Sequence, residues 1–172
     1  MVDYFHKIVA VLNQVDKKSI NRVVGLIQSS DRIYIIGNGG SQATAEHFAV
    51  DLLKYGGKRA YALSSSAMLT MSSNDFGYEH SFNWLLSRYL DKNDLIFGIS
   101  TSGKSLNILR AFFSRLDVKS VFLTGLWGKN EAKNVSEAII INSKQTQILE
   151  DISLIICHNI ALKLNELRGK NG

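Results

Sequence analysis

The segment Asp94-Leu-Ile-Phe-Gly-Ile99 passes directly into Ser100-Thr-Ser-Gly-Lys-Ser105, and this junction decides the fold class. The first six residues are mostly branched aliphatic and aromatic, a composition typical of a buried strand. The next six carry four hydroxyl side chains, and apolar residues at helical spacing follow them. A buried strand that enters a helix through a loop of small residues is the repeating unit of parallel α/β sheets.

Four further apolar runs that precede turn residues predict strands at 32–36, 59–63, 120–124 and 137–142. Helical spacing predicts helices over 2–29, with a break near Asp16, and over segments around 47–53, 67–71, 82–89, 106–112 and 145–167. Right-handed crossovers then predict an α/β fold with a flavodoxin-like, doubly wound, five-stranded parallel sheet. The extra N-terminal helix and the long C-terminal helix favour packing between subunits, and capping of the monomer is the alternative.

Length and composition indicate a single globular domain over residues 1–172. The hydrophobic fraction is 45% and the net charge is +5, which disfavours disorder. The single cysteine excludes a disulfide scaffold, and no apolar run approaches the roughly 20 residues of a bilayer span. The first residues lack the profile of a secretory signal, so we expect a cytoplasmic protein without a membrane partner. The basic residues are scattered, and we expect no nucleic-acid partner either.

Two loops that follow predicted strands predict a phosphate site. The first is Gly37-Asn-Gly-Gly-Ser41 and the second is Ser100-Thr-Ser-Gly-Lys-Ser105. Small residues let the backbone approach an anion, and the N–H groups that begin the next helix favour negative charge. Neither loop has the spacing of a Walker A or a dinucleotide fingerprint. Ordinary glycine turns and serine N-caps are the alternative interpretation of each loop taken alone.

Two histidines and two carboxylates form a second candidate site. His47 and Asp51 share one face of a predicted helix, and Glu150 and His158 lie on the last predicted helix. Such a set suits a divalent metal, zinc first, with other first-row metals possible. A metal-free acid–base pair is the alternative, because histidine titrates near neutrality. A purely structural explanation of these residues is that the histidines pack against their neighbours and that the acidic residues stabilise the first turn of the last helix.

The loop motifs resemble the sugar isomerase (SIS) domain family. The resemblance rests on Gly37-Asn-Gly-Gly-Ser-Gln-Ala-Thr-Ala-Glu-His-Phe-Ala49, Ser73-Asn-Asp-Phe-Gly77 and Gly98-Ile-Ser-Thr-Ser-Gly-Lys-Ser105. Within that family the chain is most similar to the bacterial phosphoheptose isomerases. The resemblance implies an aldose–ketose isomerase of sedoheptulose 7-phosphate, with zinc and with active sites between the subunits of a homotetramer. It also implies a role in heptose synthesis for lipopolysaccharide or capsule.

The resemblance assigns roles to positions of this sequence. Phosphate contacts fall on Ser41, Ser100, Thr101, Ser102 and Ser105. Contacts to the sugar chain fall on Asn38 and Asp75, and Gly39 and Gly40 are further expected substrate-binding residues. Metal ligands fall on His47, Asp51, Glu150 and His158, of which Asp51, His158 and Glu150 are also the expected catalytic residues.

Two of these positions depart from the family pattern. Asp51 stands where the family has glutamate, and Glu150 stands where it has glutamine, so we hypothesise that Glu150 compensates for the shorter Asp51. The alternatives to this activity are isomerisation of another phosphosugar, or a non-catalytic module that binds phosphosugars or a replication initiator.

Overall fold

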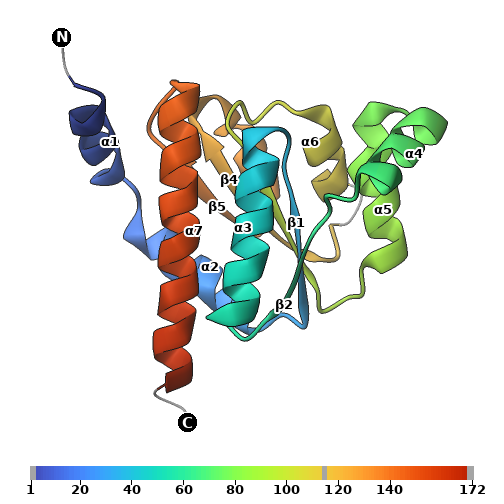
Figure 1. Cartoon of the computed structure of the whole chain (residues 1–172), viewed down its shortest axis with the longest axis horizontal. Coiled ribbons are helices and arrows are strands. Elements are labelled where there is room, and N and C mark those ends of the chain that lie inside the picture. The colour runs from blue at the N-terminus through green and yellow to red at the C-terminus, as the bar shows by residue number, and fades with distance from the viewer. Residues whose placement is uncertain (1–2, 114–115, 170–172) are drawn as a thin grey trace.

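The computed structural model describes residues 3–113 and 116–169, which form a parallel sheet between two layers of helices (Figure 1). The strand order is β2-β1-β3-β4-β5, and all neighbouring strands are parallel. This order confirms the flavodoxin-like sheet, and the strand ends agree with the predicted ends to within one residue. The strands are β1 (Arg32–Ile36), β2 (Arg59–Ala62), β3 (Leu95–Ser100), β4 (Lys119–Gly125) and β5 (Glu137–Ile141).

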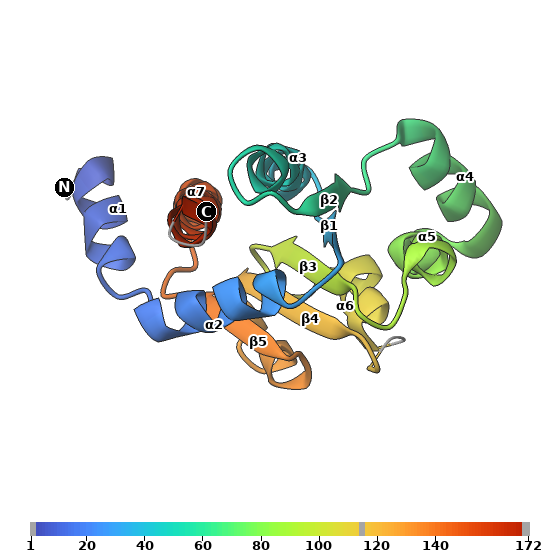
Figure 2. The ribbon, with the colours of Figure 1, turned by 90° about the horizontal axis from the view of Figure 1, so that it is seen from below.

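Helices cover both faces of the sheet. One core joins β1, β3, β4 and β5 to α2 (Lys17–Gln28), α3 (Gly40–Lys54) and α7 (Thr146–Gly169). The other core joins the opposite face to α4 (Ser66–Phe76), α5 (Ser81–Tyr89) and α6 (Leu106–Phe113). Of these helices, α4 packs outside α5 (Figure 2). The strands are therefore covered on both sides, which explains their continuous apolar runs.

The predicted N-terminal helix is two helices, α1 (Tyr4–Leu12) and α2, with the break where Asp16 lies. Asp16 caps α2, because its carboxylate accepts the backbone N–H groups of Lys18 and Ser19. Figure 2 shows α1 beside α7, outside the helix layer that covers the sheet. The Tyr4 hydroxyl donates a 2.6 Å hydrogen bond to Asp151 and so fastens α1 to α7.

The crossovers that leave β1 and β3 go to opposite faces of the sheet. Because β1 and β3 are neighbours, with Ile36 opposite Gly98, the loops at their carboxyl ends lie side by side. Such a switch point is where open α/β sheets bind ligands. Within residues 3–113 and 116–169, no helix combines the length and the apolar character that a membrane span requires.

Candidate active site

Two histidines and one aspartate from adjacent helices meet on the α3–α7 pair. His47 and Asp51 are one turn apart on α3, and His158 comes from α7, which runs beside α3 (Figure 1). The Nε2 atoms of His47 and His158 are 3.1 Å apart. Each of these atoms is 3.5 Å from Oδ2 of Asp51. Three of the four predicted metal ligands therefore lie together, although they come from opposite ends of the chain.

The dimensions of this group, which we call the histidine–aspartate triangle, suit a divalent metal. Ligand atoms bound to zinc at about 2.0–2.2 Å in a tetrahedron are about 3.3–3.6 Å from one another. The three observed separations, 3.1, 3.5 and 3.5 Å, are close to these values. The His47 and His158 side chains are 52% and 43% exposed, so the triangle is open to solvent in the single subunit. Three protein ligands and one open position are typical of catalytic zinc sites.

The contact between the two imidazoles also constrains their protons. Two nitrogen atoms at 3.1 Å cannot both direct lone pairs at each other, so they must share a proton or face a common cation. The Asp51 side chain, only 10% exposed, supplies a negative charge that compensates either arrangement. The triangle can therefore bind a metal or transfer protons, the two functions that the sequence left open.

Glu150 lies apart from the triangle, near the start of α7, with its carboxylate against the first turn of α3. It does not belong to the set of ligand atoms that lie within 4.8 Å of one another. Its carboxylate lies against Gly40, where an added Cβ would be 2.4 Å from Oε1. The start of a helix favours such a negative charge. Glu150 thus lies between the first loop and the triangle, and its role as a ligand stays a prediction.

The second loop is fixed by its own hydrogen bonds. The Ser100 hydroxyl accepts the Gly103 N–H at 3.1 Å and lies 3.2 Å from the Ser105 hydroxyl. Thr124 on β4 donates to the Ser100 carbonyl at 2.7 Å. Gly103 has a φ of +65°, and an added Cβ would be 2.2 Å from Cα of Gly128. A loop held in this way before binding loses little conformational entropy when it binds an anion.

The first loop and the triangle are separated by a distance that suits a sugar phosphate. The first loop ends where α3 begins at Gly40, and His47 follows seven residues later. At 1.5 Å per residue this is about 10 Å along the helix. An extended seven-carbon chain with a terminal phosphate has a comparable length. A phosphate at the loops would therefore leave the other end of the sugar near the imidazoles.

The predicted contact Asp75 bonds to Asn74, whereas Tyr78 bonds to the first loop. Asp75 is exposed near the end of α4 and accepts a hydrogen bond from Asn74. Tyr78 follows in the short 3-10 helix η1 (Tyr78–His80) and donates to Asn38 at 2.8 Å. Asn107 in the first turn of α6 also bonds to Asn38. Our sequence reasoning missed Tyr78 and Asn107; the only signal was the proximity of Tyr78 to the Ser73–Gly77 motif.

Cys157 precedes His158 but faces the core. Its side chain is fully buried, and burial raises the pKa of the Cys157 thiol well above its usual range. The thiol therefore stays protonated and packs as a small apolar group.

Comparisons with known proteins agree with this fold. Residues 3–114 match the family model described as the SIS domain. A solved phosphoheptose isomerase, GmhA from Neisseria gonorrhoeae, has a TM-score of 0.87 and 25% identity, covering 94% of this chain and 95% of that chain. The fold, the loops and the family model together define an SIS domain protein.

The sequence relatives narrow this class. A probable phosphoheptose isomerase from Thermoplasma volcanium is 34% identical over 158 residues, which are 87% of this chain and 80% of the relative. A phosphoheptose isomerase from Helicobacter pylori is 32% identical over 155 residues, covering 86% and 81%. The chain belongs to the phosphoheptose isomerase family and is an aldose–ketose isomerase. The relatives favour this enzyme over a non-catalytic binding module.

Proposed function

We propose that the protein converts sedoheptulose 7-phosphate into D-glycero-D-manno-heptose 7-phosphate. The observation that carries this proposal is the histidine–aspartate triangle. Its imidazole nitrogens are 3.1 Å apart, and His47 lies on α3, the helix that begins at the end of the first loop. The names of the relatives from Thermoplasma volcanium and Helicobacter pylori support the reaction class.

The reaction moves a proton between the first two carbons of the sugar through an enediol. A base removes a proton from C1 of the ketose, the C1=C2 double bond forms, and the C2 oxygen takes up a proton. The C1 hydroxyl then loses its proton while C2 receives one, which yields the aldehyde. We assign the carbon-bound proton to Asp51, with Glu150 assisting or replacing it, and the oxygen-bound protons to His158.

His47, Asp51 and His158, with Glu150 as a fourth candidate, would hold a divalent metal, for which zinc is our first choice. A bound metal polarises the carbonyl group and stabilises the negative charge of the enediolate. A carboxylate has two oxygens, so Asp51 can face the imidazoles with Oδ2 and keep its other oxygen for proton transfer. His47 binds the metal and transfers no proton in this scheme.

The phosphate would bind at the two loops, away from the reacting carbons. The hydroxyls there and the N–H groups that begin α6 provide donors for several phosphate oxygens. Backbone and side chains nearby would bind the sugar chain. The phosphate ligands we propose are Ser41, Ser100, Thr101, Ser102 and Ser105. The sugar contacts we propose are Asn38 and Asp75, and Gly39 and Gly40 complete the substrate-binding loop.

We further propose that the protein is a homotetramer whose subunits complete one another's active sites. Exposed apolar side chains flank both imidazoles: Val50 and Leu53 on α3, and Ile155 and Leu162 on α7. Ile155, His158 and Leu162 have the spacing of one helix face. An apolar surface next to polar catalytic groups is typical of a surface that another protein covers.

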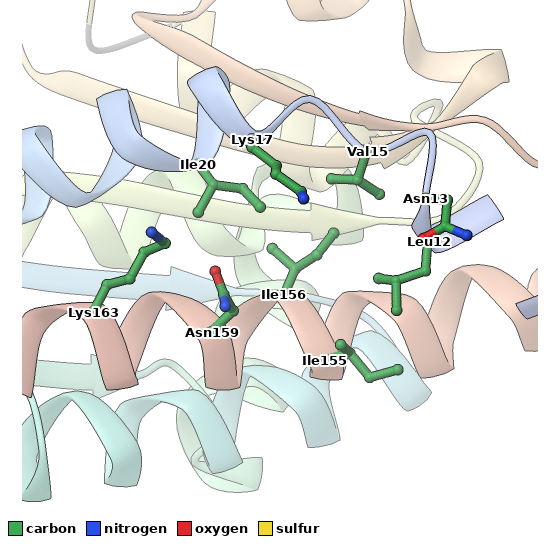
Figure 3. A pocket seen from close by; sticks show the side chains of 9 residues that line it. All are labelled: Leu12, Asn13, Val15, Lys17, Ile20, Ile155, Ile156, Asn159 and Lys163. Atoms are coloured by element: carbon green, nitrogen blue, oxygen red, sulfur yellow. The ribbon is translucent and has the colours of Figure 1, made fainter. Parts of the chain in front are cut away.

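A hollow on the neighbouring side of α7 supports the same assembly. It has a volume of about 440 Å³ and lies between α7 and the start of α2 (Figure 3). Ile20 and Ile156 point toward each other across it in Figure 3. The exposed Phe5 on α1 is the kind of side chain that a second copy would bury in such a hollow. A cytoplasmic location and a role in heptose supply for lipopolysaccharide or capsule complete the proposal.

The direct test is conversion of sedoheptulose 7-phosphate by the purified, assembled protein. We expect the heptose 7-phosphate signal to appear in NMR spectra with zinc-loaded protein and to weaken strongly with metal-depleted protein. The matched control is His6→Ala, which removes an exposed histidine on α1 outside the triangle. Failure of the zinc-loaded protein to convert this sugar would reject the proposed substrate.

A further inference from the structure

Three side chains from three separate elements form a closed hydrogen-bonded network between the two loops. Asn38 lies in the first loop, Asn107 lies in the first turn of α6, and Tyr78 begins η1. The Asn38 and Asn107 carboxamides bond reciprocally, with Nδ2 to Oδ1 distances of 3.0 and 2.9 Å. The Tyr78 hydroxyl lies 2.8 Å from Oδ1 of Asn38. Asn107 is only 1% exposed, so this network is anchored in the interior.

One backbone group fixes the direction of every bond in this network. The oxygen and the nitrogen of a carboxamide have nearly the same size and shape. The hydrogen-bond partners must therefore decide which of the two atoms occupies which position. The backbone N–H of Ile108 can only donate, and it lies 3.1 Å from Oδ1 of Asn107. That contact sets the Asn107 amide, and the reciprocal pair then sets the Asn38 amide. Tyr78 must therefore donate its hydroxyl proton to Asn38.

The fixed orientation leaves one donor of Asn38 unused. Oδ1 of Asn38 accepts from both Tyr78 and Asn107, which occupies both of its lone pairs. Nδ2 uses one hydrogen for Asn107. Its second hydrogen has no acceptor within the part of the chain that the structure describes. This N–H lies at the switch point between β1 and β3, where a ligand of this fold binds.

We propose that Tyr78 and Asn107 are positioning residues that hold the Asn38 carboxamide so that its free N–H donates to an oxygen of the sugar chain. The inference rests on the proposed function for the identity of the sugar. If the carboxamide turned over, it would present a carbonyl oxygen, which cannot bond to a ligand oxygen that carries no proton. The orientation of Asn38 thereby selects a hydrogen-bond acceptor at this point of the substrate.

The main test is Tyr78→Phe, which removes one hydroxyl from a largely exposed side chain. Titration calorimetry with sedoheptulose 7-phosphate should show binding about tenfold weaker than that of the unchanged protein. Inorganic phosphate should bind with unchanged affinity, because the hydroxyl groups of the two loops would hold it. The matched control is Tyr61→Phe, an exposed tyrosine on β2, which should leave both affinities unchanged. The proposal would be overturned if Tyr78→Phe weakened the binding of both ligands equally, or if it weakened the binding of neither.

A second variant provides a readout that a structural role alone would not change. Asn107→Asp keeps the acceptor for the Ile108 N–H but loses the donor to Asn38. A protonated aspartic acid regains a donor, so the affinity of the variant relative to the unchanged protein should recover as the pH falls. A ratio that stays constant with pH in a folded variant would contradict the inference. Calorimetric binding of sedoheptulose 7-phosphate without its turnover would reject the proposed conversion of this sugar and leave this inference standing.

Discussion

His47 and His158 are 111 positions apart in the chain, and their Nε2 atoms are 3.1 Å apart in the fold. Each atom is also 3.5 Å from the same oxygen of Asp51. The histidine–aspartate triangle therefore depends on both α3 and α7, because neither helix carries all three groups. A change in either helix should affect metal binding and catalysis together.

Replacement of either histidine tests the triangle. His47→Ala and His158→Ala should each lower turnover by at least about 100-fold, since a general acid–base group and a metal ligand contribute at least that much. Zinc content, measured by mass spectrometry of the purified protein, should fall in both variants. The exposed His6→Ala variant should keep its zinc and its turnover. Full zinc content in His158→Ala would contradict a metal site at the triangle.

Removal of the metal should lower thermal stability as well as activity. A ligand that binds only the folded state stabilises it by about 2.7 kcal/mol when its concentration is 100 times its dissociation constant. We therefore expect the unfolding midpoint of chelator-treated protein to rise when zinc is added. The same addition should not raise the midpoint of a protein that carries both His47→Ala and His158→Ala. An equal rise in both proteins would place the zinc elsewhere.

The two departures from the family pattern form a testable pair. Asp51→Glu lengthens the base by one methylene, and a misplacement of about 1 Å can cost roughly 100-fold in rate. Glu150→Gln removes a charge that lies against Gly40. We expect each single change to lower the turnover number and the double change to restore it, at equal zinc content. Single changes without effect would reject the compensation.

Two glycines should respond oppositely to the same substitution. Gly103→Ala forces a side chain into a φ of +65° and against Gly128, so we expect a loss of about 1–3 kcal/mol in the free energy of unfolding. Gly25→Ala lies on α2 with nothing within 4 Å of the added Cβ, and it should stabilise by about 0.5–1 kcal/mol. Urea denaturation measures both changes. A stable Gly103→Ala protein would show that the second loop is not fixed as described.

A charge introduced on the exposed apolar face of α3, which carries Val50 and Leu53, should prevent the subunits from assembling. Leu53 is 63% exposed, so Leu53→Asp would cost the isolated subunit little, while a buried unpaired carboxylate would destabilise an interface. We expect a smaller mass by light scattering and a lower turnover number. Leu116→Asp, between α6 and β4 and 75% exposed, is the matched control and should keep the assembled mass. A Leu53→Asp protein of unchanged mass would exclude this face from the interface.

The sequence by itself determined the elements and their order. Short apolar runs next to turn residues predicted all five strands, because a strand buried on both faces needs apolar side chains at every position. The connection rules for parallel sheets then fixed the order β2-β1-β3-β4-β5. The break at Asp16 was also predictable, since the capping of α2 depends on residues close in sequence. The exception was α4, which extends to Phe76, beyond the short helix expected over 67–71.

Only the tertiary structure decided which candidate side chains meet. Helical spacing fixes which face of a helix a residue lies on. How far one packed helix is shifted along the axis of its neighbour depends on the whole core that both helices contact. The axial position of α7 relative to α3 brings His158 to His47 and leaves Glu150 two turns away against Gly40. The same reason explains the network of Asn38, Asn107 and Tyr78, whose members come from three elements. Contacts of this kind follow from packing across the sheet, which no local pattern encodes.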